Sequence, residues 1–139
     1  MLSAAELQNH GVMTAAAEKL AEAFLPGPLT VVLAGRGGGK IGFRIPSDPV
    51  SRALIAIWGF PLAGTSANLS GQASPVTGEE AVAAMEGKVD VIINAGKTEL
   101  GRESTVVDLS GERPVVLREG CISLEELSAV LEKTTEKGF

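Results

Sequence analysis

Cysteine, histidine and aromatic residues are scarce in this 139-residue sequence. Cys121 is the only cysteine, which excludes an internal disulfide and a multi-thiolate metal site. His10 is the only histidine, so a Ser-His-Asp relay or a histidine metal site has little support. Aromatic residues make up 4%, and the interior must therefore be filled mainly by Val, Ile, Leu and Ala. We expect neither a metal site nor a catalytic nucleophile.

The sequence also lacks a membrane-length apolar run and an excess of basic residues. No apolar stretch approaches the roughly 20 residues that a spanning helix needs, and no basic segment precedes an apolar core at the N-terminus. Twelve basic residues face 17 acidic ones, for a net charge of -5. That balance argues against binding nucleic acid through overall charge, although a local basic pocket remains compatible with it. We expect a cytoplasmic protein with no membrane segment.

The composition that remains is that of a globular α/β protein. Hydrophobic residues make up 45% and charged residues 21%, and the length fits a single domain over residues 1–139. Helical spacing or composition predicts four helices, at residues 13–24, 49–58, 78–85 and 123–134. Short apolar runs predict six strands, at residues 29–33, 41–45, 61–66, 89–93, 104–109 and 114–118. Elements mixed in this order indicate a sheet that is partly parallel and partly antiparallel, flanked by helices.

Polar residues mark the starts of three of these helices. Ser47 or Asp48 can cap the helix at residues 49–58, and Thr77 can cap the helix at residues 78–85. Ser123 precedes the last helix, with Glu126 at the capping-box position. Glycines at positions 35 and 37–39 favour a hairpin between the first two strands.

The first candidate site is the polar segment 64–71, with the sequence GTSANLSG. Hydroxyl, amide and backbone N–H groups at the end of a strand can bind anionic phosphate oxygens, and glycine lets the backbone approach a ligand. Thr65, Ser66 and Asn68 are the candidate ligands. The same residue types also form ordinary hydrogen-bonded turns, and the pattern alone favours a turn.

Arg44 is the second candidate because it alternates with Phe43 and Ile45 and should face away from them. A guanidinium among apolar neighbours needs an anionic partner. That partner is either a substrate carboxylate or an acid of the protein such as Asp48. The residues by themselves favour the salt bridge.

Ser104 and Arg118 form the third candidate. Ser104 begins the strand expected at residues 104–109, and Arg118 ends the strand expected at residues 114–118. A hairpin would bring these two residues into one region. A hydroxyl and a cation there could face a nucleotide. Ordinary ion pairs at a solvated strand end are the alternative.

Several segments resemble, in this order and spacing, the YrdC-like threonylcarbamoyl-AMP synthase family. The most specific are the T-S-A-N-x-S-G run at residues 65–71 and the E-S-T-V-V-D run at residues 103–108. The likeness extends from about residue 17 to the end through the segments FLPGPLTVVL, IGFRIPSDP, PLAGTSANLSGQASP, VDVIINAGKTELGRESTVVDL and PVVLREG. The resemblance implies a YrdC-like twisted mixed sheet flanked by helices.

The resemblance also implies an activity. Members of this family condense L-threonine, bicarbonate and ATP, normally with Mg²⁺, into threonylcarbamoyl-AMP and pyrophosphate, and partner proteins transfer the threonylcarbamoyl group to tRNA. By motif, Arg44 would bind the threonine carboxylate and Ser104 would border the threonine. Thr65, Ser66, Asn68 and Arg118 would contact the nucleotide. Such transfers depend on positioning and charge neutralisation rather than on a protein nucleophile.

The sequence departs from the family pattern at its front. Family members carry roughly sixty or more further residues there, an estimate from usual domain sizes, including a K-x-R motif and a threonine-binding strand. Neither is present, since Lys19 is the only basic side chain before Arg36 other than His10. We therefore expect an N-terminally truncated fold with an exposed edge, which a homodimer could cover.

Two alternative functions follow from the same resemblance. A short member could be a non-catalytic module that binds nucleotide or double-stranded RNA, although the acidic balance weakens the RNA version. A carbamoyl-transfer domain of the hydrogenase-maturation type is a third hypothesis. Those chains carry zinc-finger parts, which a single cysteine excludes here.

Overall fold

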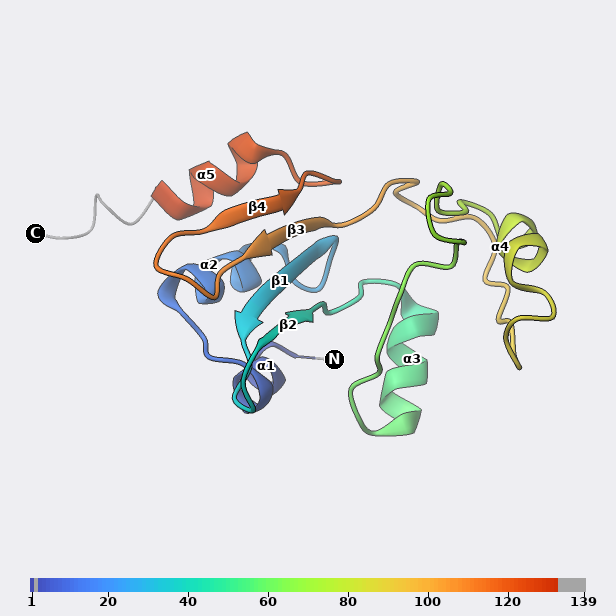
Figure 1. Cartoon of the computed structure of the whole chain (residues 1–139), viewed down its shortest axis with the longest axis horizontal. Coiled ribbons are helices and arrows are strands. Elements are labelled where there is room, and N and C mark those ends of the chain that lie inside the picture. The colour runs from blue at the N-terminus through green and yellow to red at the C-terminus, as the bar shows by residue number, and fades with distance from the viewer. Residues whose placement is uncertain (2, 133–139) are drawn as a thin grey trace, which may run out of the picture. The chain divides into compact units, whose positions relative to one another are not determined.

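The computed structural model describes residue 1 and residues 3–132, and the chain divides into two compact units. The first comprises Met1–Leu62 and the residues from Ser104 onward, and the second comprises Ala63–Glu103. The first unit contains a four-stranded sheet with the order β2-β1-β3-β4 (Figure 1). Its strands are β1 (Leu29–Ala34), β2 (Lys40–Phe43), β3 (Thr105–Asp108) and β4 (Val115–Arg118).

The sheet is mixed, as the sequence predicts. Strands β1 and β3 are parallel, whereas β2 pairs antiparallel with β1 and β4 pairs antiparallel with β3. The two predicted hairpins are confirmed. Residues 35–39 connect β1 to β2, with Gly38 and Gly39 at positive φ, and residues 109–114 connect β3 to β4. A register shift between Val106 and Val107 leaves one extra residue in β4.

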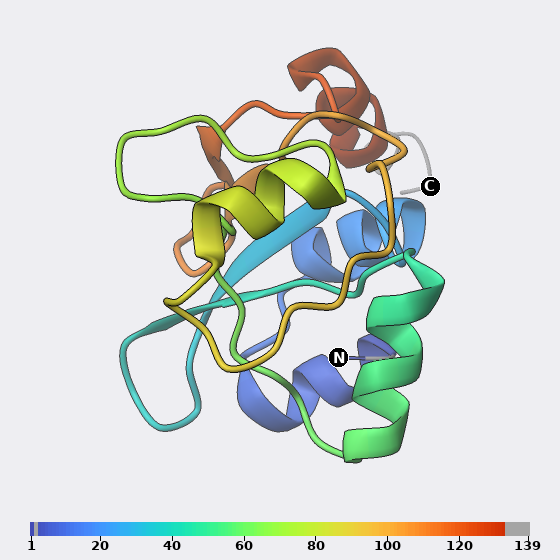
Figure 2. The ribbon, with the colours of Figure 1, turned by 90° about the vertical axis from the view of Figure 1, so that its right-hand side faces the viewer.

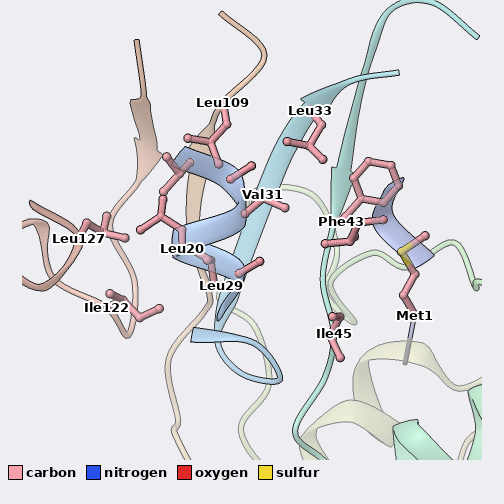
Figure 3. Close-up of a cluster of buried hydrophobic side chains, with 14 residues drawn as sticks. Met1, Leu20, Leu29, Val31, Leu33, Phe43, Ile45, Leu109, Ile122 and Leu127 are labelled. Atoms are coloured by element: carbon pink, nitrogen blue, oxygen red, sulfur yellow. The ribbon is translucent and has the colours of Figure 1, made fainter. Parts of the chain in front are cut away.

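The described residues of the first unit form the helices α1 (Ala4–His10), α2 (Ala15–Phe24), α3 (Pro49–Trp58) and α5 (Leu124–Glu132). Helix α2 packs against β1 and α5, and α1 packs against α2. Leu29, Val31 and Leu33 of β1 are fully buried on this face (Figure 3). Leu20 of α2 and Leu127 of α5 join the same cluster, so one face of the sheet is closed by apolar packing.

The second unit contains one helix, α4 (Gly78–Met85), and no strand within residues 63–103 (Figure 2). Its connecting segments are held by local hydrogen bonds, such as the one from Thr98 N to the Val76 carbonyl at 2.8 Å. Gly78 is buried against Asn94, and a Cβ at this position would overlap the Asn94 amide. Glycine is therefore needed at the first residue of α4.

The predicted capping residues are confirmed. Asp48 Oδ1 accepts from Ser51 N at 2.6 Å at the start of α3. Thr77 and Glu80 form a reciprocal capping box on α4. Before α5, Ser123 and Glu126 make the corresponding pair of contacts. These backbone hydrogen bonds favour the ionised carboxylates, and the pKa values of Asp48, Glu80 and Glu126 lie below their usual range.

Two predicted strands are wrong, and one helix of the structure was not predicted. Residues 61–66 and 89–93 are not strands, and the side chain of Val91 is 76% exposed. An apolar run becomes a strand only where another strand pairs with its backbone. Helix α1 was missed because it is only seven residues long and has no side-chain cap. Within the described part of the chain, no helix is long and apolar enough to cross a membrane.

Candidate functional site

The first unit gathers three of the predicted site residues at one end of its sheet. Arg44 follows the last residue of β2, Ser104 precedes the first residue of β3, and Arg118 is the last residue of β4. β1 begins at Leu29 at this same end, because Leu29 pairs with Thr105. Adjacent strands lie about 4.8 Å apart, so the backbones of β2 and β3 are about 10 Å apart here.

Alternation places these side chains on the face opposite the packed helices. Phe43 and Ile45 are buried, whereas Arg44 between them is exposed. The predicted orientation of Arg44 is therefore confirmed. Its Nε donates to the Gly27 carbonyl at 3.3 Å, which ties the side chain to the turn before β1.

The expected salt bridge of Arg44 is not formed within the described residues. Asp48, the predicted partner, caps α3 instead. Among the described residues, an ion pair joins Lys40 and Asp108 at 2.8 Å. Arg44 thus presents a cation at the end of the sheet that no described carboxylate neutralises.

Ser104 and Arg118 are in direct contact, as the predicted hairpin requires. Arg118 Nε and Nη2 both donate to the Ser104 carbonyl, at 3.1 and 2.9 Å, and Nη2 also lies 3.2 Å from Ser104 Oγ. Ser104 is 5% exposed, whereas Arg118 is exposed. The carbonyl fixes one edge of the guanidinium. The arrangement can therefore present an oriented cation to an anionic ligand.

Thr30 is a site residue that the sequence reasoning missed. Its Oγ1 lies 2.9 Å from Ser104 Oγ, so the two hydroxyls are hydrogen-bonded between the arginines. The signal was available, since Thr30 is the polar residue between the buried Leu29 and Val31 and must face the other side of the sheet. Two guanidiniums flanking two hydroxyls are suited to a ligand that carries anionic oxygens.

The remaining three predicted residues lie in the second unit. Thr65 and Ser66 are exposed, and their hydroxyls have no hydrogen-bond partner among the described residues. They are free to contact a ligand. Asn68 differs, because its Nδ2 donates to the carbonyls of Leu69 and Gln72 at 3.1 and 2.8 Å. The turn interpretation therefore holds for Asn68.

Asn68 also borders an open cavity of about 600 Å³ within this unit. Ser74 Oγ lies 3.4 Å from Asn68 Oδ1 and donates to Glu103 Oε1 at 2.7 Å. The cavity is lined by Asn68, Gln72, Ala73, Ser74, Pro75, Val76, Glu80, Ala83 and Ala84. Its wall combines amide, hydroxyl and apolar groups, with Glu80 as its one acidic residue.

Lys40 and Asp108 lie on the same face as the arginines but farther along the strands. Lys40 donates to Asp108, Ser110 donates to the same carboxylate, and these contacts lower the pKa of Asp108 to about 2. No group of three His, Cys, Asp or Glu side chains that could hold a metal ion occurs among the described residues.

Comparison with known proteins places the chain in a family. The family model of the Sua5, YciO and YrdC proteins, described as "Telomere recombination", matches residues 1–120. The threonylcarbamoyl-AMP synthases of Pyrococcus abyssi and Bacillus subtilis are 39% and 36% identical to this chain, over 124 and 125 residues respectively. Each match covers 83% of this chain and 36% of the relative. A Methanocaldococcus jannaschii relative is 35% identical, and the match covers 88% of this chain and 61% of that protein.

Solved structures give the same result. Sua5 of P. abyssi in complex with L-threonine superposes with a TM-score of 0.88 at 35% identity, covering 94% of this chain and 42% of that one. YciO of Escherichia coli superposes with a TM-score of 0.81 at 30% identity, covering 91% of this chain and 66% of that one. The chain belongs to the Sua5/YciO/YrdC family and has its mixed α/β fold, as the resemblance predicts.

Proposed function

We propose that this chain forms part of an L-threonylcarbamoyladenylate synthase, which acts in the threonylcarbamoyladenosine modification of tRNA. The observation that carries the proposal is that Arg44, Thr30, Ser104 and Arg118 lie at one end of the sheet on the same face, with Thr30 and Arg118 in contact with Ser104. The relatives from P. abyssi and B. subtilis, at 39% and 36% identity, are threonylcarbamoyl-AMP synthases, and a solved relative binds L-threonine. The chain spans 36–61% of those curated relatives, so the complete reaction is part of the proposal.

The proposed reaction has two bond-forming steps. The amine of threonine attacks the carbon of bicarbonate, and loss of water gives a carbamate. A carbamate oxygen then attacks the α-phosphorus of ATP, forming the P–O bond of threonylcarbamoyl-AMP while the bond to pyrophosphate breaks. Both steps need anionic reactants to be held close together, which positioned cations and hydroxyls can achieve.

We assign the ligand contacts according to charge. Arg44 would bind the threonine carboxylate, because its guanidinium is exposed and has no carboxylate partner among the described residues. Ser104 would border the threonine, and Arg118 would contact the nucleotide. Thr65 and Ser66 would donate to ATP phosphates. Asn68 would border the same ligand from its turn, while its Nδ2 keeps the loop folded.

Magnesium would enter this reaction as part of the substrate, MgATP. Mg²⁺ usually takes one or two carboxylates plus substrate phosphates and retains several waters. Phosphate oxygens would therefore be its main ligands. No protein residue is assigned to the metal.

The proposed partners follow from the reaction. Proteins that transfer the threonylcarbamoyl group to tRNA would accept the product, and the cytoplasm is the proposed location because tRNA is modified there. The alternative of a non-catalytic module for nucleotide or double-stranded RNA has less support. The relatives from P. abyssi and B. subtilis are synthases, and the net charge of -5 opposes RNA binding.

A homodimer is a further part of the proposal, supported by the surface of α3. Val50, Leu54, Ile57 and Trp58 recur at helical spacing, and Ile57 and Trp58 are 86% and 63% exposed. We expect light scattering at micromolar concentration to give a dimeric mass that Ile57→Asp reduces to a monomer. Val91→Asp, at an apolar side chain 76% exposed in the other unit, should leave the mass unchanged. A monomeric mass for the unmodified chain would refute the dimer.

The proposed activity is tested by titrating the chain calorimetrically with ATP and Mg²⁺, with and without L-threonine and bicarbonate, and then assaying pyrophosphate. We expect ATP binding, and pyrophosphate release that depends on both threonine and bicarbonate. Binding without release would favour the non-catalytic module. An absence of binding to either ligand would contradict the proposal.

A further inference from the structure

A buried threonine, Thr105, follows Ser104, the residue that Arg118 contacts at the end of the sheet. Thr105 follows Ser104 in β3, and alternation turns it to the opposite face, where it is fully buried. It cannot touch a ligand bound on the face of Ser104. Its hydroxyl is nevertheless fully used, because it donates to the Ile122 carbonyl at 2.6 Å and accepts from Gly120 N and Ile122 N, both at 2.9 Å.

These three hydrogen bonds hold the backbone that leaves β4. A hydroxyl has one donor and two acceptor positions, and Thr105 uses each of them on residues 120–122. Arg118 lies two residues before Gly120. Its guanidinium donates to the carbonyl of Ser104, the residue next to Thr105. Ser104, just before β3, thus holds the side chain of Arg118, and Thr105, the first residue of β3, holds the backbone that follows it.

The need for this contact follows from the sheet. The pairing of β3 with β4 shifts register between Val106 and Val107, next to the pair formed by Val106 and Arg118. A bulge weakens the ladder locally, so the ladder alone holds the end of β4 less firmly than a regular pair would. Thr105 supplies the hydrogen bonds beyond that point.

We infer that Thr105 is a positioning residue for Arg118. It acts through the backbone of Gly120 and Ile122. It thereby keeps the guanidinium of Arg118 on the face of the sheet opposite α2. The consequence for nucleotide affinity rests on the proposed function, in which Arg118 contacts the nucleotide. The consequence for the geometry of Arg118 does not depend on any ligand.

The test compares Thr105→Val, which removes the hydroxyl and keeps the shape, with Thr105→Ser, which keeps the hydroxyl. Val107→Ala is the matched control, because Val107 is buried on the same face of the same strand but makes no side-chain hydrogen bond. In Thr105→Val we expect amide exchange of Gly120 and Ile122 to accelerate by about tenfold or more, as for a lost buried hydrogen bond. The Arg118 Nε–H signal should also lose its protection, whereas Val107→Ala, which removes core packing without removing a hydrogen bond, should not accelerate exchange at Gly120 and Ile122 more than at the other amides of β3 and β4.

Nucleotide binding provides the functional readout. Affinity for MgATP should fall about tenfold in Thr105→Val, recover in Thr105→Ser, and show no further loss when Thr105→Val is added to Arg118→Ala. Additive losses in the double variant, or an unchanged Arg118 Nε–H signal in Thr105→Val, would overturn the inference. If the unmodified chain does not bind MgATP, the proposed function fails, and the exchange measurements still decide the role of Thr105.

A measurement on the unmodified chain covers the case in which Thr105→Val does not fold. The inference requires the Gly120 and Ile122 amides to exchange as slowly as the amide of Val107 in β3. Exchange at the rate of an open loop would contradict it.

Discussion

The two compact units of the chain hold their candidate ligand-binding residues in different ways. In the first unit, Arg44, Ser104 and Arg118 are attached to strands, and the ladder and the buried cluster fix where each one lies. In the second unit, Thr65 and Ser66 lie in a loop that is held by short-range hydrogen bonds such as those of Asn68. The sheet therefore places the two arginines together with the hydroxyls of Thr30 and Ser104, whereas a loop places the hydroxyls of Thr65 and Ser66.

This division fits the chemistry that the proposal requires. A guanidinium recognises a carboxylate or phosphate through directed hydrogen bonds, so its orientation matters. Hydroxyl groups rotate to suit the oxygen they meet. A loop can therefore supply the hydroxyls, whereas a rigid scaffold is more suitable for the arginines.

The largest expected effect comes from comparing a buried apolar side chain of the first unit with an exposed one of the second. Leu33→Ala removes a fully buried side chain of β1 and should lower the free energy of unfolding by about 2–5 kcal/mol. Val91→Ala shortens an apolar side chain that is 76% exposed in the second unit, and it should change the free energy of unfolding by less than about 0.5 kcal/mol. Denaturant unfolding measures both. Equal losses would show that the second unit buries Val91 in solution.

The next effect compares two helix caps of the same chemistry. Thr14 accepts from Ala17 N at α2 and Thr77 accepts from Glu80 N at α4, both at 3.2 Å. Thr→Ala at an N-cap costs about 1 kcal/mol. Thr14→Ala should lower the unfolding free energy of the first unit by that amount. Thr77→Ala should accelerate amide exchange in α4 about fivefold and leave β1 unchanged.

Serine at each position is the control, because it keeps the accepting oxygen. Faster exchange of the β1 amides in Thr77→Ala, or unchanged exchange in α4, would be inconsistent with a locally stabilised second unit.

The smallest effect concerns the ion pair between Lys40 and Asp108, which lies on the face of the sheet opposite α2. The hydrogen bond from Lys40, with those from Ser110, lowers the pKa of Asp108 from 3.8 to about 2. The contribution of ionised Asp108 to the stability of the folded state is therefore complete above about pH 4 and is lost as the pH falls through about 2. Lys40→Met should raise the pKa of Asp108 in a carboxyl NMR titration, and Lys88→Met in the second unit should not. A pKa that stays near 2 in Lys40→Met would assign the shift to Ser110.

Local signals explain what the sequence could predict. Helices α3 and α4 have the predicted bounds, because Asp48 and Thr77 form caps with residues three positions away. The hairpins followed from glycine and from strand spacing, and the alternation of Phe43, Arg44 and Ile45 gave the orientation of Arg44. Each of these features depends on residues close together in the chain.

Features that depend on distant residues were harder to predict. The run at residues 89–93 has strand composition, yet a strand also needs a paired backbone, and no residue pattern indicates whether that partner is present. Thr30 meets Ser104 across 74 positions of sequence, which only the parallel pairing of β1 and β3 makes possible. The choice of Asp48 as a cap rather than as the partner of Arg44 depends on geometry between separate elements.

The central claim is that the end of the sheet binds threonine and nucleotide through different arginines. Calorimetric titration of Arg44→Ala and Arg118→Ala with L-threonine and with MgATP tests it most directly, with Arg113→Ala, an exposed arginine in the β3–β4 connection, as the control. We predict that Arg44→Ala weakens threonine binding about tenfold or more and MgATP binding less, that Arg118→Ala does the reverse, and that Arg113→Ala changes neither. Equal losses for both ligands in both variants would contradict the account.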